Sequence, residues 1–230
     1  MTMIQTRIDA VRNRIQAACA ASGRAPEEVT LLAVSKTFGA DAVQAAYAAG
    51  QTAFGENYIQ EAVEKITALK HLPLQWHCIG PVQSNKTRLV AEHFDWVHTV
   101  DRLKIAQRLS DQRPAGLPPL QVCIQVNVDG GATKSGVAPE AALALAKDIA
   151  KLPFLRLRGL MCIPEPASDF IAACALFERA RALFNSLNAE GLALDTLSMG
   201  MSDDLEAAIA SGSTMVRVGS AIFGARSYPA

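Results

Sequence analysis

The chain has 230 residues, of which 50% are hydrophobic, and it carries 22 basic and 22 acidic side chains. A chain of this length and apolar content can bury one substantial core as a single domain. A formal net charge of zero argues against nucleic acid or an anionic membrane as a partner, because both select for a basic excess.

The cysteines are odd in number and scattered, without the CxxC or Cys/His spacing of a metal site: Cys19, Cys78, Cys123, Cys162 and Cys174. We therefore expect free thiols in a reducing compartment and no bound metal. The chain opens on Met1 without an apolar signal region, and it has no apolar run of the roughly 18 residues that a membrane span needs. We expect a cytoplasmic protein that does not enter a membrane.

The predicted elements alternate along the chain after one opening helix. Apolar residues recur at helical spacing from Ile4 to Cys19, and this helix stops near Gly23. Apolar segments typical of strands follow at 30–35, 52–54, 75–79, 95–99, 120–126, 156–161, 194–198 and 214–218. Helical patterns lie between them at about 40–49, 56–70, 84–92, 101–112, 139–150, 168–189 and 202–211, and a short apolar turn at 221–224 closes the series.

This alternation predicts a parallel α/β fold. Eight strand-helix units in a chain of this length fit one (β/α)8 TIM barrel over residues 1–230, with the first helix outside the count. The alternative is a doubly wound open sheet. That fold usually has a glycine-rich fingerprint after its first strand, and Ser35-Lys36-Thr37-Phe38-Gly39 is not one.

In such a barrel the carboxyl ends of the strands meet at the face that carries the active site. Lys36 ends the first strand, and a primary amine at the mouth of a core can become a nucleophile toward carbonyls. Lysines at strand ends are more often simply solvated. Other polar or glycine residues that end strands are Asn57, His77, Gly80, Asn127, Ser198 and Arg217.

Two later segments give Lys36 more weight. Ser198-Met199-Gly200-Met201-Ser202 and Arg217-Val218-Gly219-Ser220 supply hydroxyls, backbone N–H groups and a cation. Ser202 can be read as a helix N-cap or as a phosphate ligand. Loops after strands seven and eight frequently bind phosphate in barrels. Together with the amine, these groups could hold an aldehyde that carries a phosphate.

Arg217 and His77 each allow two interpretations. Arg217 could cap the barrel through an ion pair, or its guanidinium could face a ring nitrogen of the ligand and weaken the ring as an electron sink. His77 could be an ordinary satisfied histidine or a pocket residue. Glu61, Glu64 and Lys65 are predicted to form a solvated helix face.

Six motifs then point to a family. They read LLAVSKT, FGENYIQEAVEK, WHCIGPVQSNK, TKSG, LRGLMCIPEP and LSMGMSDDLEAAIASGSTMVRVGSAIFG. In this order and spacing the chain resembles the YggS/PROSC family of pyridoxal-phosphate-binding proteins over nearly its whole length. One departure is Lys36-Thr37-Phe38-Gly39, where many relatives have a further lysine and a proline, so a second amine beside Lys36 is lost.

The resemblance implies a barrel related to the N-terminal domain of alanine racemase, with pyridoxal 5'-phosphate (PLP) held as a Schiff base on Lys36. It implies that Ser202, Gly219 and Ser220 contact the phosphate and that Arg217 faces the pyridine nitrogen. The residues expected to line the pocket are Asn57, His77, Ser198 and Met199. Lys134, in the TKSG motif, would be a secondary acceptor for the aldehyde.

Three functions are compatible with the sequence. The first is a monomeric carrier that buffers PLP or delivers it to PLP-requiring apoenzymes, with no catalytic residue. The second is a PLP-dependent racemase or decarboxylase. A racemase of this fold would need a second base from a C-terminal β domain, which we do not expect in a chain that ends at Ala230. The third is a cofactor-free interaction protein on a barrel scaffold.

Overall fold

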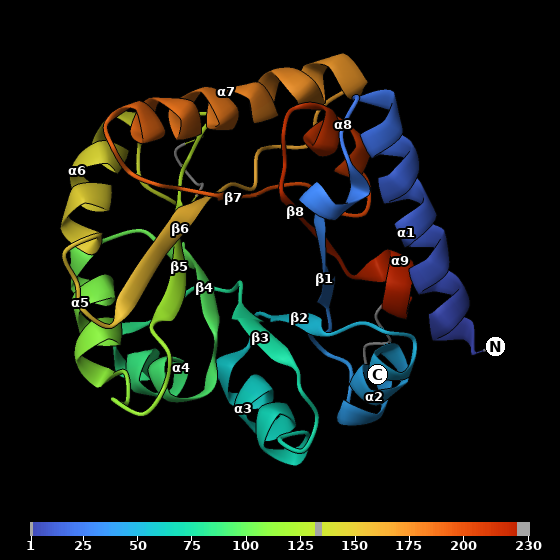
Figure 1. Cartoon of the computed structure of the whole chain (residues 1–230), viewed down its shortest axis with the longest axis horizontal. Coiled ribbons are helices and arrows are strands. Elements are labelled where there is room, and N and C mark those ends of the chain that lie inside the picture. Colours follow the sequence, from blue (N-terminus) through green and yellow to red (C-terminus); the bar gives the residue numbers. More distant parts are fainter. Residues whose placement is uncertain (1, 132–134, 225–230) are drawn as a thin grey trace.

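The computed structural model describes residues 2–131 and 135–224. Its parallel strands close into a barrel in sequence order, with β1 paired to both β2 and β8 (Figure 1). This confirms the predicted TIM barrel. The strands are β1 (Thr30–Val34), β2 (Ala53–Glu56), β3 (Gln75–Cys78), β4 (Trp96–Val100), β5 (Leu120–Gln125), β6 (Leu155–Met161), β7 (Thr196–Ser198) and β8 (Met215–Val218).

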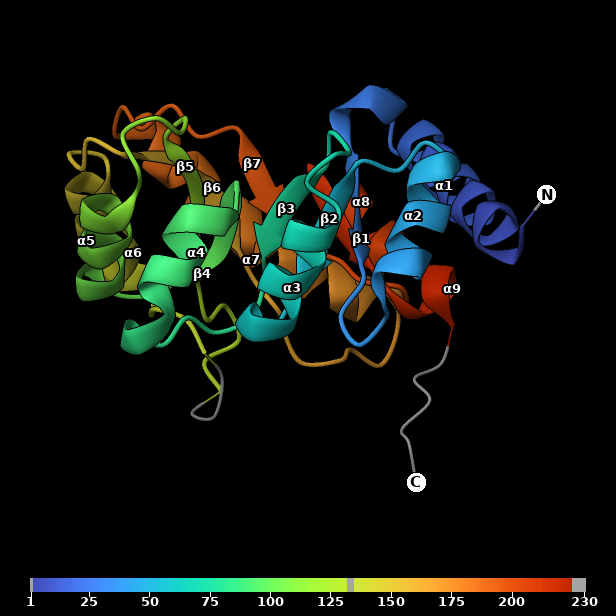
Figure 2. The ribbon, with the colours of Figure 1, turned by 90° about the horizontal axis from the view of Figure 1, so that it is seen from below.

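Helices surround the barrel, and α1 lies outside it against α8 and α9 (Figure 1). The helices are α1 (Met3–Ala21), α2 (Ala40–Ala48), α3 (Ile59–Ala68), α4 (Thr87–His93), α5 (Leu103–Gln112), α6 (Pro139–Ile149), α7 (Phe170–Ala189), α8 (Leu205–Ala210) and α9 (Ser220–Phe223). Short 3-10 turns η1 (Pro26–Glu28) and η2 (Ser84–Lys86) precede β1 and α4. The loops that follow β1 and β6 lie at the same edge of the barrel in the side view (Figure 2).

Apolar side chains fill two separate layers because successive strand residues point to opposite faces. The outer layer packs the strands on the helices and includes Ala33, Phe54, Val97, Ile124 and Leu197. The interior of the barrel contains two smaller apolar clusters. One comprises Leu32, Val34, Ala53, Ile79 and Met215, and the other comprises Trp96, Cys123 and Met161.

The cysteines are free thiols, as predicted. Burial raises the pKa of Cys78, Cys123 and Cys162 to about 12, so these thiols stay protonated at neutral pH and belong to the core. Within the described residues no group of His, Cys, Asp and Glu side chains could hold a metal ion. The same part of the chain has no helix long and apolar enough to cross a membrane.

The helices that follow β2 and β7 begin slightly later than predicted. The helix expected from residue 56 begins at Ile59, because β2 continues through Glu56. The helix expected from residue 202 begins at Leu205 with Asp204 as its N-cap, and the Asp204 Oδ1 accepts a hydrogen bond from the Met201 N–H at 2.6 Å. Ser202 therefore lies in the turn before α8 and is not its N-cap.

Candidate functional site

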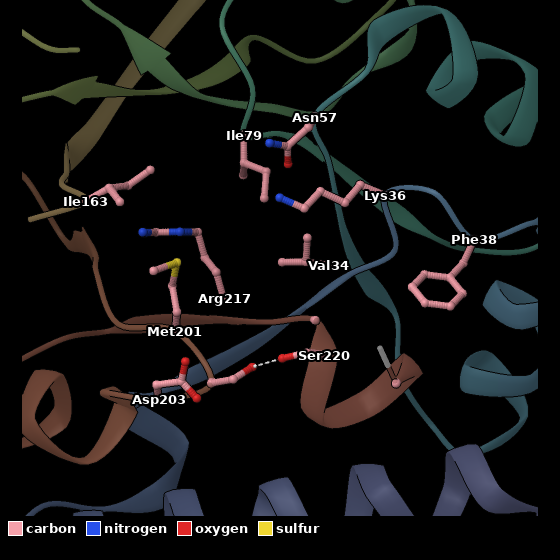
Figure 3. Close-up of a pocket in the computed structure, with 13 residues that line it drawn as sticks. Val34, Lys36, Phe38, Asn57, Ile79, Ile163, Met201, Asp203, Arg217 and Ser220 are labelled. Carbon is pink, nitrogen blue, oxygen red and sulfur yellow. Dashed lines mark hydrogen bonds between the residues drawn. The ribbon is translucent and has the colours of Figure 1, made fainter. Parts of the chain in front are cut away.

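A pocket of about 330 Å³ opens at the carboxyl ends of the strands (Figure 3). This is the face on which TIM barrels place their active sites. The residues that line it come mainly from the ends of β1, β2, β3 and β8 and from the loops after β6 and β7. They are Val34, Lys36, Phe38, Asn57, Ile79, Ile163, Met201, Ser202, Asp203, Arg217, Gly219, Ser220 and Gly224.

Lys36 follows the buried end of β1, and its half-buried side chain points into the pocket (Figure 3). Both neighbours in the chain are held in place. Ser35 is fully buried and its hydroxyl donates to Glu56 Oε1 at 2.6 Å, while the Thr37 N–H donates to Glu61 Oε1 at 2.9 Å. Thr37 has a φ of 68°, a left-handed conformation that residues other than glycine seldom adopt. The backbone around Lys36 is therefore fixed from both sides.

The anchor of these contacts is Lys65, and the prediction that Lys65 is solvated is wrong. Its side chain is 6% exposed and its Nζ lies 2.7 Å from Glu56 Oε1 and 2.6 Å from Glu61 Oε1. It also donates to the Ser35 carbonyl at 2.9 Å. Burial raises the pKa of Glu56, while the charge of Lys65 and its hydrogen bond act to lower it. Glu64 is exposed, as expected.

Arg217 is 4% exposed, yet its guanidinium reaches the pocket (Figure 3). Nη1 donates to Ser198 Oγ at 2.8 Å and Nη2 donates to the Cys162 carbonyl at 3.0 Å. Burial lowers the pKa of Arg217, but an arginine remains protonated in proteins. Neither contact is an ion pair, so the interpretation of Arg217 as an ion-paired cap is not supported by its side-chain contacts.

The loops after β7 and β8 meet at one end of the pocket. The Ser220 hydroxyl donates to Ser202 Oγ at 3.2 Å (Figure 3). Gly219 lies between Arg217 and Ser220, and a Cβ there would lie 3.2 Å from the Val34 carbonyl oxygen and 3.3 Å from its Cβ. A side chain at this position would therefore be tightly packed, whereas glycine leaves the wall open.

The first helix braces this end of the pocket from outside. Arg14 of α1 donates to the Ser202 carbonyl at 2.9 Å and pairs with Glu206 of α8 through two hydrogen bonds of 2.7 and 2.9 Å. Sequence reasoning missed Arg14, because nothing in an amphipathic helix distinguishes one surface arginine from another. Asp203, a carboxylate in the pocket wall, was also missed as a pocket residue.

Asn57, the residue directly after β2, lines the pocket. Gly80 packs so closely on it that an added Cβ would lie 2.2 Å from the Asn57 carbonyl oxygen. The Asn57 Oδ1 is buried and has no hydrogen-bond partner among the described residues. The wall of the pocket thus contains an acceptor that a ligand donor could satisfy.

The remaining predicted site residues lie elsewhere. His77, Ser198 and Met199 are fully buried and do not belong to the pocket lining of the described structure. His77 lies within the barrel interior, where its ring stacks on Trp96, and Ser198 reaches the pocket only through its bond to Arg217. Lys134 lies outside the described residues.

Comparison with known proteins identifies the family. The chain is 63% identical over its whole length to the pyridoxal phosphate homeostasis protein of Pseudomonas aeruginosa, covering 99% of that protein. It is 55% identical over 99% of both chains to the protein of the same name from Escherichia coli K12. The chain belongs to this family. The family model for the alanine racemase N-terminal domain matches residues 7–227.

Solved structures of the family share the barrel. The structure of PipY from Synechococcus elongatus, with PLP bound, has a TM-score of 0.84 and 39% identity, and the match covers 96% of this chain and all of PipY. Alanine racemase of Clostridium difficile is 17% identical with a TM-score of 0.73, and the match covers 99% of this chain but 57% of the racemase. The second likeness is one of fold alone.

Proposed function

We propose that this chain binds PLP as a Schiff base on Lys36 and acts in PLP homeostasis as a carrier. The observation that carries the proposal is the convergence of Lys36, Arg217 and the Ser202–Ser220 pair on one pocket of about 330 Å³. Pockets of this size suit a small organic ligand. The relatives named pyridoxal phosphate homeostasis protein and the PLP-bound PipY support the choice of cofactor.

The residues present fit the cofactor. The hydroxyls of Ser202 and Ser220 and the backbone at Gly219 would hold the phosphate, where glycine leaves room beside Val34. The unpartnered Oδ1 of Asn57 would accept from a donor group of the ligand. When bound, PLP would supply an aldehyde, and the Lys36 amine would condense with it and release water.

Arg217 supports a carrier in preference to a catalyst. A guanidinium only donates hydrogen bonds, so Arg217 would hold a pyridine nitrogen in its unprotonated form. A ring in this form is a poor sink for electrons. Among the described lining residues the ionisable side chains are Lys36, Asp203 and Arg217, which leaves Asp203 as the carboxylate available as a second base. We propose a cytoplasmic monomer that passes PLP to apoenzymes, with Lys134 as a secondary acceptor.

Lys36→Ala is expected to abolish the near-visible absorption band that appears when the purified protein is mixed with PLP. Borohydride reduction followed by peptide mass mapping should place the label on Lys36 in the unmodified chain. Lys151→Ala is the matched control, because the Lys151 side chain is 74% exposed and does not line the pocket. Label spread evenly over surface lysines, or a band that survives in Lys36→Ala, would contradict the proposal.

Ser220→Asp is expected to weaken PLP binding at least about tenfold, because a carboxylate would lie beside the phosphate. Binding of pyridoxal, which lacks the phosphate, should change little. Titration of both aldehydes against the variant and against Ser220→Ala separates charge repulsion from loss of the hydroxyl. Equal weakening for both ligands would place the phosphate elsewhere.

Assays for racemisation and decarboxylation distinguish the carrier from an enzyme. The PLP-loaded protein is expected to leave the stereochemistry and the carboxylate of common amino acids unchanged over hours. Turnover that is lost in Asp203→Asn would favour the enzyme, because Asp203 is the carboxylate that faces the pocket.

A further inference from the structure

A row of polar side chains crosses the apolar interior of the barrel. Gln75 Oε1 lies 3.0 Å from His77 Nε2, and His77 Nδ1 lies 2.9 Å from His98 Nε2. His98 Nδ1 lies 2.9 Å from Ser198 Oγ, which accepts from Arg217 Nη1 at 2.8 Å. The row therefore runs from the exposed start of β3 to the pocket.

The barrel interior also contains two apolar clusters, one around Leu32 and Met215 and the other around Trp96 and Met161. Both histidines and Ser198 are fully buried. Polar groups in such a place are costly unless they are hydrogen-bonded. Both ring nitrogens of each histidine have a partner in the row. The row is therefore fully hydrogen-bonded at its two histidines, although its surroundings are apolar.

The direction of every hydrogen bond in the row follows from its two ends. Arg217 can only donate, and the Gln75 oxygen can only accept. Burial lowers the pKa of His77 to about 3, and burial with the charges of His77 and Arg217 lowers that of His98 well below 6.5. Both rings are therefore neutral at pH 7, and a neutral imidazole has one donor and one acceptor nitrogen.

These constraints leave one consistent arrangement. Since His77 Nε2 faces an acceptor, it carries the proton, and its Nδ1 accepts from His98 Nε2–H. The His98 Nδ1 then accepts from the Ser198 hydroxyl, and the lone pairs of Ser198 are left for Arg217. In the opposite arrangement the hydroxyl hydrogen of Ser198 would have no acceptor in the row, and His77 Nε2 would face the Gln75 oxygen without a proton.

We infer that His77, His98 and Ser198 are positioning residues that aim the Arg217 guanidinium into the pocket through a one-way hydrogen-bond chain, with the proton of each histidine on Nε2. Ser198 fixes Nη1 while the Cys162 carbonyl fixes Nη2, so two contacts define the guanidinium plane. Every hydrogen in this hydrogen-bond chain points away from the Arg217 guanidinium, and this common direction strengthens the successive hydrogen bonds. Only the identity of the ligand group that Arg217 faces depends on the proposed function.

The tautomers can be measured without any cofactor. Long-range 1H–15N correlation spectra of the full chain at pH 7.5 should show the Nε2–H form for two histidines, assigned through His77→Gln and His98→Gln. The chain has four histidines, and the exposed ring of His71 supplies a solvent-accessible reference signal. An Nδ1–H form or an imidazolium at either buried position would overturn the inference, whether or not the protein binds PLP.

Two substitutions of His98 test whether the hydrogen-bond chain positions Arg217. In His98→Asn the side-chain oxygen can stand near the position of Nδ1 and accept from Ser198, whereas His98→Leu has no acceptor. We expect His98→Leu to bind PLP about tenfold more weakly and to shift the absorption of the bound cofactor, because the Ser198 hydroxyl loses the acceptor that orients it toward Arg217. His98→Asn should restore most of both. Equal losses in the two variants, with both folded by circular dichroism, would overturn the positioning role.

If the unmodified chain fails to bind PLP, the proposed function fails while the tautomer measurement still decides the direction of the hydrogen-bond chain. If PLP binds through Lys36 but the two histidines have another tautomer, the positioning role alone fails.

Discussion

Replacing Lys65 with methionine is expected to lower the free energy of unfolding by about 3–5 kcal/mol, the usual cost of removing one partner of a buried ion pair. The substitution keeps the length and apolar stem of the side chain but removes the ammonium group. Glu56, 1% exposed, would then keep a hydrogen bond from Ser35 but no counter-ion. Urea denaturation followed by circular dichroism measures the change.

A second substitution provides the matched control. In Lys65→Met with Glu56→Gln, the amide can still accept from the Ser35 hydroxyl and no uncompensated charge remains at the buried position 56, while the Glu61 carboxylate is 35% exposed and can be solvated. This double variant is expected to be more stable than Lys65→Met alone. Glu64→Gln, on the exposed side of α3, should change stability by less than about 0.5 kcal/mol. A loss below about 1 kcal/mol in Lys65→Met would show that the pair is not buried in solution.

The same variant should also affect the pocket. Lys65 holds the Ser35 carbonyl and pairs with Glu61, whose carboxylate holds the Thr37 N–H. Thr37 occupies a left-handed conformation that costs on the order of 1–3 kcal/mol and persists only if its surroundings impose it. Without Lys65, we expect Lys36 to form its bond with PLP more slowly in rapid-mixing absorption experiments.

The sequence predicts the barrel well because each strand is a short apolar run bounded by turn residues, and because strand ends in a parallel barrel share one face. Lys36, Asn57, Arg217, Gly219, Ser220 and Ser202 were placed at that face by this rule, and the structure brings them to one pocket. The same rule does not predict how deep in the barrel an inward-pointing side chain lies. His77 and Ile79 both point inward from the same part of the chain, but only Ile79 reaches the pocket.

Lys65 shows a different kind of failure. Its spacing of four from Glu61 is that of an exposed ion pair on a helix. The same spacing is compatible with burial when the lysine also lies within the apolar stripe, and Lys65 follows buried Ala62 by three positions and precedes buried Leu69 by four. Glu56, on β2, decides whether Lys65 is exposed or buried, because its carboxylate is the counter-ion that stabilises the buried ammonium group. The sequence of α3 alone does not contain this information.

Acidification from pH 7.5 to 5.0 is expected to remove about 2 kcal/mol of folding stability through His77 alone. The pKa of His77 is about 3 in the folded chain and 6.5 in the unfolded chain. Below pH 6.5 the unfolded state therefore binds more protons than the folded state, and stability falls as the pH falls toward 3. His98, with a pKa also well below 6.5, contributes in the same direction.

The contribution of His77 can be separated from that of the carboxyl groups by comparing how steeply stability falls with pH in two proteins. Burial raises the pKa of Glu56, Asp95 and Asp204, which opposes the loss of stability on acidification. These carboxyls are unchanged in His77→Gln, so urea midpoints at pH 7.5, 6.5 and 5.0 should show a shallower loss in that variant than in the unmodified chain. Parallel slopes would mean that His77 is already charged or exposed. A shallower slope would show that the buried row directed at Arg217 also makes the barrel sensitive to acid.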